Sequence, residues 1–311
     1  MALSSALKIR KIFLSLLLFP SFIESSIFNS QSIVHPQVNE SGMIVSQHYL
    51  ATNVGAQILQ EGGNAYDAAI AVAFTLAVVL PRAGNIGGGG FMVMYDNETS
   101  ESFSIDYRET APALATKDMY LNKDGSVNKK RAREGILSIG VPGTVYGMWE
   151  VHKKFGSLEW KKLLQPAIDL AEEGFIMSPF MVDALNSRYK KLSNYKNFKK
   201  IFYEQFPVQI NKRLVQAELA KTLKIIAKNG VKGFYEGEVA NKIAQDMRKR
   251  GGLISATDLL NYRPVWRKPI KGDFKEYEIV TMGPPSSGGI HIIQMLNILE
   301  NFNLHELGHN S

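Results

Sequence analysis

Arg108 is the residue of this chain whose type and position point most directly to chemistry. It opens the motif Arg-Glu-Thr-Ala-Pro at 108–112 and follows a run of four glycines at 87–90. A guanidinium is planar and permanently charged, so it can bind a carboxylate through two parallel hydrogen bonds. The residues alone leave two roles open: Arg108 binds a carboxylate ligand, or it pairs with Asp106 or Glu109 and holds a strand in place.

The glycine run indicates a place where the backbone packs so closely against other backbone or a ligand that no Cβ is tolerated. It does not fit a phosphate-binding loop, because neither the G-x-G-x-x-G spacing nor the P-loop spacing is present. An apolar, alanine-rich segment precedes the glycines and a strand-like segment, 91–95, follows them. The run therefore predicts either the floor of a binding site or a tight helix-to-strand connection.

The composition disfavours several common chemistries. The chain contains no cysteine, which excludes disulfides, thiol nucleophiles and thiolate metal sites. The segment 305–309 fits the zinc-protease pattern H-E-x-x-H, but Gly308 weakens the helix that must present both histidines, and we expect no third ligand. We therefore expect neither a metal nor a cofactor.

Positive charge is unevenly distributed along the chain. The formal net charge is +7, and basic residues gather near the N-terminus and between Arg188 and Arg213, among Tyr, Asn and Phe residues. No nucleic-acid-binding motif accompanies them, so we expect a solvated helical or loop face and no nucleic-acid partner. The second group comprises Lys190, Lys191, Lys196, Lys199 and Lys200.

Residues 1–26 have the features of a signal peptide. Three basic residues at 8–11 precede an apolar stretch at 12–23, and small residues follow at 25–26. The apolar stretch is shorter than a transmembrane helix requires and contains Pro20. We therefore expect export to the periplasm or the medium, with no stable membrane span after cleavage of the signal.

Helix and strand signals alternate along the rest of the chain. With 311 residues, of which 45% are hydrophobic, the chain can bury a sizeable core. Gly62-Gly63 can end one helix and Asn64 can N-cap the next, which is apolar on all sides and is therefore expected to be buried. Helices are predicted at 50–60, 65–79, 157–173, 217–229, 238–250 and 290–299, and strands at 91–95, 103–107 and 278–282.

A series of spaced blocks covers nearly everything after residue 40. They are Glu-Gly-Gly-Asn-Ala-Tyr-Asp-Ala-Ala at 61–69, the glycine run, Asp-Tyr-Arg-Glu-Thr-Ala-Pro at 106–112, Gly-Val-Pro-Gly-Thr-Val-Tyr-Gly at 140–147, Leu-Gln-Pro-Ala-Ile-Asp-Leu-Ala at 164–171, Phe-Tyr-Glu-Gly at 234–237, Tyr-Arg-Pro at 262–264 and Pro-Pro-Ser-Ser-Gly-Gly at 284–289. In type and order they resemble the large-subunit portion of the gamma-glutamyltransferases, also called gamma-glutamyltranspeptidases or glutathione hydrolases.

The resemblance implies an α/β fold, the αββα sandwich of N-terminal-nucleophile hydrolases, incomplete because the chain stops before the small subunit. In such enzymes the precursor cuts itself, and the new N-terminal threonine of the smaller piece attacks the gamma-glutamyl carbonyl with its own amine as base. The Thr-Thr-His-like segment that carries this threonine is not present in the chain. We therefore expect no catalytic residue here, and no activity from this chain alone.

The resemblance also assigns Arg108 to binding of the α-carboxylate of the gamma-glutamyl group, with Asp106 and Glu109 as supports. The implied partners are glutathione or other gamma-glutamyl compounds, which would be transferred or hydrolysed, and a complementary small subunit. Residues 27–311 would then be a large-subunit region truncated at its C-terminus. The alternative is a noncatalytic remnant, or a periplasmic protein that binds amino acids or gamma-glutamyl compounds.

Overall fold

The computed structural model of the chain describes residues 38–307. The helices and strands described below belong to the compact unit that begins at Met43, called the second unit. The predicted signal peptide at 1–26, and the second histidine of the zinc-like pattern, His309, lie outside the described residues.

Two helices begin the second unit, α2 (Tyr49–Gln60) and α3 (Ala65–Val79), and they pack against each other. The turn between them forms as predicted: Gly62 adopts a positive φ of 88°, and the Asn64 side chain accepts the backbone N–H groups of Tyr66 and Asp67. These are the cap conformations that end one helix and start the next. Most of α3 is buried, as its uniformly apolar sequence requires.

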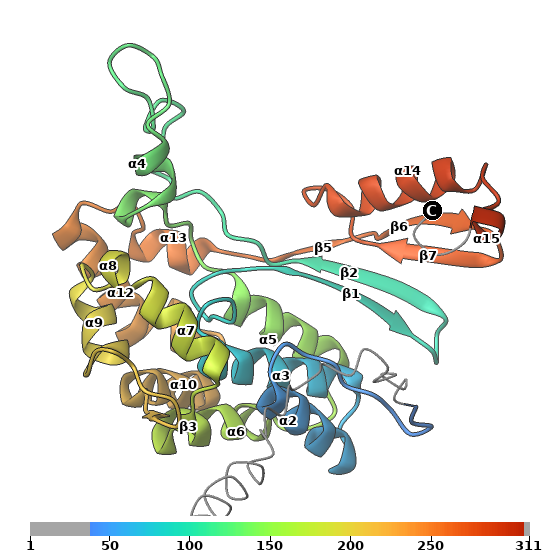
Figure 1. Cartoon of the computed structure of the whole chain (residues 1–311), viewed down its shortest axis with the longest axis horizontal. Helices are drawn as coiled ribbons and strands as arrows, with labels where there is room; N and C mark the ends of the chain where they lie inside the picture. The colour runs from blue at the N-terminus through green and yellow to red at the C-terminus, as the bar shows by residue number, and fades with distance from the viewer. Residues whose placement is uncertain (1–37, 308–311) are drawn as a thin grey trace, which may run out of the picture. The chain divides into compact units, whose positions relative to one another are not determined.

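The predicted hairpin forms a three-stranded antiparallel sheet with a strand from much later in the chain. Strand β1 (Phe91–Asp96) pairs with β2 (Glu101–Asp106), and β2 pairs with β5 (Val265–Arg267). Helix α3 and helix α5 (Thr144–Phe155) pack beneath this sheet (Figure 1). The opposite face of β1 carries Val93 and Tyr95, which are 39% and 59% exposed.

The main core lies among the helices that follow. Helix α6 (Trp160–Glu173) packs against α3 and α10 (Ala217–Asn229), and α11 (Lys232–Tyr235), α12 (Gly237–Arg250) and α13 (Ala256–Asn261) extend this layer. The largest fully buried side chains are Phe74, Ile58, Ile70, Ile105, Met148, Leu163, Leu164, Ile168, Leu223, Ile226 and Leu259.

Two details of this layer differ from the sequence prediction. Helix α6 starts at Trp160 and not at 157, because the backbone of Glu159 is extended, and the N–H groups of Ser157 and Leu158 before it donate to the buried Asp67 carboxylate. Helix α5 was not predicted, since its start lies in a Gly- and Pro-rich block. Its Gly147 packs directly on the ring of Tyr107, where a Cβ would lie 2.3 Å from Cγ.

The segment between α6 and α10 consists of short elements. These are α7 (Pro179–Ser187), α8 (Tyr189–Leu192), α9 (Lys196–Phe202) and a two-stranded ladder of β3 (Phe175–Ile176) with β4 (Arg213–Leu214). The lysines of α8 and α9 are exposed, as predicted. A further short helix, α4 (Lys129–Arg133), and a 3-10 turn at Ile136–Ser138 precede α5.

The last part of the unit is a hairpin with a helix against it. Strands β6 (Ile270–Phe274) and β7 (Tyr277–Thr281) pair, and α14 (Gly288–Leu299) packs on β6, followed by α15 (Leu304–Leu307). Along α14 only Gly289 is buried, although the helix is strongly apolar. Within residues 38–307, none of the helices is both long and apolar enough to span a bilayer.

Candidate functional site

A cavity of about 390 Å³ lies where the two ends of the β1–β2 hairpin meet a loop from much later in the chain. One end is formed by the end of the glycine run, the other by the residue pair after β2, and the loop is the one before α14. The lining residues are Gly89, Gly90, Phe91, Arg108, Glu109, Pro285, Ser286 and Ser287. The structure therefore places the predicted site residue, Arg108, beside the predicted glycine floor.

The floor depends on the last two glycines of the run. A Cβ on Gly89 would lie 2.4 Å from the Tyr107 carbonyl oxygen and 2.8 Å from the Cα of Arg108, and one on Gly90 would lie 2.9 Å from the Tyr107 ring. Gly90 and Tyr107 exchange both backbone hydrogen bonds, at 3.3 and 3.0 Å. Close approach of two backbones thus sets Arg108 against the floor. Gly87 has open space, so the expectation that the whole run excludes a Cβ was wrong there.

The backbone of Arg108 is held on both sides while its side chain is exposed. Its N–H donates to Oδ1 of Asp106 at 3.0 Å, and its carbonyl oxygen accepts from the hydroxyl of Tyr262 at 2.9 Å. Among the described residues the guanidinium has no hydrogen bond or salt bridge. A planar cation held at its backbone and left without a protein anion can take a carboxylate from a ligand.

The alternative role for Arg108, pairing with Asp106 or Glu109, is not formed. The Asp106 carboxylate is bound by Arg267 of β5, whose Nη2 and Nε lie 2.8 and 3.0 Å from Oδ2. Glu109 is exposed and lines the same cavity as Arg108. Arg267 therefore occupies the carboxylate that would otherwise compete for Arg108.

Tyrosine rings pack behind the site. Tyr262 stacks on Tyr235 with 5.7 Å between ring centroids, and the Tyr235 hydroxyl donates to the carbonyl of Pro142 at 2.8 Å. Burial raises the pKa of Tyr107 to about 12 and raises the pKa of Tyr235 and Tyr262 as well. All three rings are therefore neutral at physiological pH, so Tyr235 and Tyr262 keep the protons that they donate.

The start of α5 connects this support to the glycine run. The N–H groups of Gly143 and Thr144 donate to the Gly88 carbonyl at 2.6 and 3.0 Å. A Cβ on Gly143 would lie 2.0 Å from the Tyr107 carbonyl oxygen and 2.1 Å from the Tyr262 hydroxyl. The Gly- and Pro-rich block at 140–147 is thus a close-packed backing for Arg108.

Sequence reasoning did not assign Pro285, Ser286 and Ser287 to the site. Ser287 is the N-cap residue of α14, so the cavity lies at the start of a twelve-residue helix, where unpaired backbone N–H groups carry partial positive charge. The available signal was the pair of serines before Gly288-Gly289, which is typical of a loop that enters a helix. Together with Arg108, this helix start favours an anionic group in the cavity.

The residues that line the cavity can bind an anionic group, but the described part of the chain places no hydrogen-bonded base beside their hydroxyl groups. The Ser286 hydroxyl accepts from the Gly288 N–H at 3.3 Å, and in the part of the chain that is described neither Ser286 nor Ser287 is hydrogen-bonded to a basic side chain. A hydroxyl without a neighbouring base is a weak nucleophile. No group of three His, Cys, Asp or Glu side chains suited to a metal occurs within residues 38–307.

Comparisons with known proteins agree on one family. Residues 51–311 match the family model described as gamma-glutamyltranspeptidase. The glutathione hydrolase proenzyme of Escherichia coli strain K12 is 46% identical over 283 residues, which are 90% of this chain and 49% of that protein. The glutathione hydrolase proenzyme of Pseudomonas sp. strain A14 is 42% identical over 94% of this chain and 52% of its own length. The chain thus spans about half the length of the curated relatives it matches.

A solved structure with the same fold is the gamma-glutamyltranspeptidase of Helicobacter pylori. The two superpose with a TM-score of 0.86 and 45% sequence identity, over 89% of this chain and 80% of that one. The mixed α/β architecture described above is therefore shared with it.

Proposed function

The chain belongs to the gamma-glutamyltranspeptidase family, where it corresponds to the large-subunit portion of the members, and we propose that it supplies the carboxylate-binding wall of a gamma-glutamyltransferase or glutathione hydrolase. The observation that carries the proposal is the exposed guanidinium of Arg108, without a protein anion among the described residues and beside a glycine floor and a helix start. In this proposal Arg108 binds the α-carboxylate of the gamma-glutamyl group of glutathione or a related compound.

The covalent step is proposed to use a threonine that lies outside these 311 residues. Its Oγ attacks the gamma-glutamyl carbonyl carbon while its own α-amine takes the hydroxyl proton; the amide C–N bond then breaks and that proton leaves with the departing amine. Water or an acceptor amine then attacks the resulting ester, which gives hydrolysis or transfer. The absence of a hydroxyl–base pair in the described cavity lining supports an outside nucleophile.

A complementary small subunit is the proposed partner. Two exposed apolar surfaces support it. One is the outer face of the three-stranded sheet, with Val93 and Tyr95, and the other is the apolar stripe on α14, formed by Ile292, Met295 and Leu299. An αββα sandwich places a second sheet over the first, and a sheet with an open apolar face lacks that layer. We propose that the partner covers both surfaces and completes the sandwich.

Coexpression with a complementary half from a relative tests the proposal directly. The chain alone should not release p-nitroaniline from a gamma-glutamyl anilide, and the reconstituted pair should. Turnover by the chain alone that is lost on a single Ser or Thr substitution within it would overturn the mechanism. Binding of a gamma-glutamyl compound without turnover, even in the pair, would favour the second candidate, a noncatalytic binding protein, which the bare lining of the cavity also suits.

Export remains part of the proposal. Residues 1–26 are proposed to be a signal peptide and 27–311 the working region, located in the periplasm or outside the cell. N-terminal sequencing of protein from an exporting host should return a start near Ser26 or Ile27. An intact Met1 in a soluble cytoplasmic pool would contradict this part alone.

A further inference from the structure

The excess positive charge of the whole chain is concentrated in one segment. Residues 188–213 contain eight lysines and arginines and one acidic residue, Glu204, a formal charge of +7 that equals the net charge of the full sequence. The rest of the chain is therefore balanced. A charge excess restricted to one stretch indicates a local surface and not a general property of the protein.

Folding places these charges outward. The eight basic residues are all exposed. Of these eight, only Lys191 forms a salt bridge within residues 38–307, with Glu134 at 2.6 Å. On α9, Lys196, Lys199 and Lys200 share one face because they are three and four positions apart. The surface formed by 188–213 is called the basic surface below.

The basic surface rests on an aromatic base that fixes its shape. Phe198 and Phe202 lie on the inner side of α9 with their centroids 4.4 Å apart, and Tyr189 stacks on Phe206 at 3.7 Å. Tyr203 is buried, and its hydroxyl donates to the Leu185 carbonyl at 2.7 Å. The lysines are thus presented by a packed element rather than by an unstructured loop.

Apolar side chains are exposed among the lysines. Ile201 is 44% exposed and Ile210 is 56% exposed, and Tyr195 and Phe206 are also exposed. The two isoleucines gain little from a polyanion in water, whereas exposed aromatic rings can also stack on nucleobases. At the edge of a bilayer these side chains can enter the boundary between headgroups and acyl chains, while neighbouring lysines contact the headgroup phosphates.

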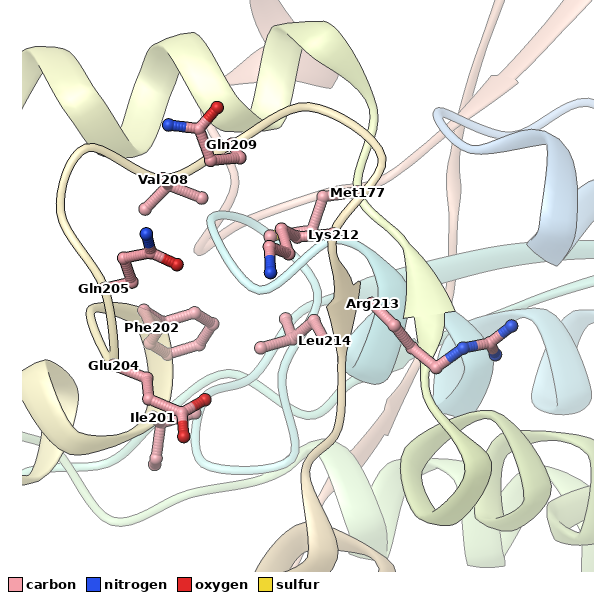
Figure 2. Close-up of a pocket in the computed structure, with 10 residues that line it drawn as sticks. All are labelled: Met177, Ile201, Phe202, Glu204, Gln205, Val208, Gln209, Lys212, Arg213 and Leu214. Carbon is pink, nitrogen blue, oxygen red and sulfur yellow. The ribbon is translucent and has the colours of Figure 1, made fainter.

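A cavity of about 510 Å³ opens within this surface and shares no residue with the Arg108 cavity. Figure 2 shows the side chain of Lys212 directed into it, near Phe202 and Leu214, with Gln205 across the opening, while Arg213 points away. The Arg213 guanidinium instead donates to the carbonyl of Gly174 at 2.7 Å. Glu204 adds one carboxylate to the lining. The lining thus mixes apolar side chains with two glutamines and the Lys212 ammonium group, and this mixture suits an anionic amphiphile.

From these observations we propose that the basic surface docks the protein on an anionic phospholipid bilayer. Lysines supply the attraction to the headgroups, and Ile201 and Ile210 enter the interface. Attachment of this kind is peripheral and reversible, since it depends on a few exposed apolar side chains and on charges that salt screens. Nucleic acid is the competing polyanion, and it would use the lysines without the isoleucines.

Vesicle flotation of residues 27–311 tests the proposal, because aggregates sink while bound protein rises with the vesicles. The proposed signal peptide is left out, since its basic and apolar residues would themselves bind anionic vesicles. Binding is expected to phosphatidylcholine vesicles that contain about one-third phosphatidylglycerol, and not to pure phosphatidylcholine. The triple variant Lys196→Glu, Lys199→Glu, Lys200→Glu should lose about 100-fold or more in apparent affinity. The matched control Lys117→Glu, Lys228→Glu, Lys249→Glu makes the same change in net charge at exposed lysines elsewhere and should bind nearly as the unchanged chain does.

A second pair of variants separates lipid from nucleic acid. Ile201→Ser with Ile210→Ser should weaken vesicle binding several-fold at unchanged charge and leave binding of an RNA oligonucleotide as it was. Circular dichroism checks that each variant is folded. The proposal would be overturned if the two lysine triple variants lost vesicle affinity equally. It would also be overturned if the isoleucine substitutions left vesicle binding unchanged and RNA displaced that binding fully.

Discussion

At the scale of single residues, Arg108 combines a fixed backbone with an exposed side chain, which the proposed function assigns to a ligand carboxylate. Asp106 and Tyr262 hold its N–H and carbonyl groups, while Arg267 neutralises the nearby carboxylate. The backbone of Arg108 is thus fixed before a ligand arrives, and binding has to order only the side chain, at a cost of about 0.5–1.5 kcal/mol.

Substitution of Arg108 should therefore affect substrate use more than folding. In the reconstituted pair, Arg108→Ala is expected to lower kcat/KM by about 30-fold to a few thousand-fold, the 2–5 kcal/mol typical of a lost charge pair. Arg108→Lys should also be impaired, because an ammonium cannot reproduce the planar fork. Arg248→Ala is the control, at an exposed arginine that has no salt bridge within residues 38–307. Unchanged kinetics in Arg108→Ala would show that Arg108 does not bind substrate.

The buried tyrosines predict loss of stability at alkaline pH. Folding raises the pKa of Tyr107 from 10 to about 12, so the folded state keeps a proton that the unfolded state loses. This contribution to the free energy of unfolding is complete below pH 10 and falls by at most about 1.4 kcal/mol per pH unit between 10 and 12. Tyr107→Phe should make urea unfolding less dependent on pH in that interval. Tyr277→Phe, at an exposed ring, should leave the dependence unchanged, and equal slopes for both variants would refute the assignment.

At the scale of elements, close contact between backbone segments places the site. The end of the glycine run and the start of α5 both touch the stretch from Tyr107 to Arg108, and they are joined by the hydrogen bonds to the Gly88 carbonyl. At Gly89, Gly90 and Gly143 the backbones lie too close for a side chain. The elements can take these positions because the three residues have no Cβ atom.

The glycines provide a matched test of this packing. Gly89→Ala places a Cβ against the backbone of Tyr107 and Arg108 and should destabilise the chain by about 1–3 kcal/mol, with a shift of Arg108 that lowers kcat/KM in the reconstituted pair. Gly87→Ala, two positions earlier, meets no atom within 4 Å and should be close to neutral. Thermal unfolding and kinetics of the two variants test whether the close packing at Gly89 is needed for stability and for the position of Arg108. A neutral Gly89→Ala would mean that the backbones can separate without consequence.

At the scale of the whole molecule, the apolar stripe on α14 indicates a covered surface. Ile292, Met295 and Leu299 follow one another at helical spacing and are 41%, 54% and 39% exposed, although the interior side of α14 packs on β6. Exposed apolar stripes of this kind mark contact surfaces or cause aggregation. In the proposed function this stripe contacts the complementary half.

Polar substitution of the stripe should separate solubility from assembly. Ile292→Lys with Met295→Lys is expected to raise the soluble fraction of the chain expressed alone and to reduce its recovery with the complementary half by about 10-fold or more. Size-exclusion chromatography and pull-down measure the two effects. Lys substitutions at exposed Val127 and Leu114, far from α14 in sequence, control for added charge. Improved solubility with undiminished assembly would show that α14 does not contact the partner.

Local sequence signals were sufficient for much of the fold. Asn64 and the glycines before it defined the boundary between α2 and α3, and the apolar content of α3 predicted its burial. The hairpin of β1 and β2 followed from two short apolar segments around a polar turn. These features depend on interactions between residues a few positions apart, and the spacing of apolar residues along the sequence indicates such interactions. The spaced blocks also identified the family and singled out Arg108.

The tertiary structure showed that the Arg108 side chain does not pair with Asp106, one of the two roles that the sequence left open. In the structure the Asp106 carboxylate is bound by Arg267, which is 161 residues away from it along the chain. Ser286, Ser287 and Tyr262 likewise reach the site only through folding. The stretch before α6 is also held from a distance, since Asp67 accepts the N–H groups of Ser157 and Leu158, 90 and 91 residues later. Partners so distant leave no periodic signal in the sequence, because charge pairs and shared hydrogen bonds depend on positions in space and not on spacing along the chain.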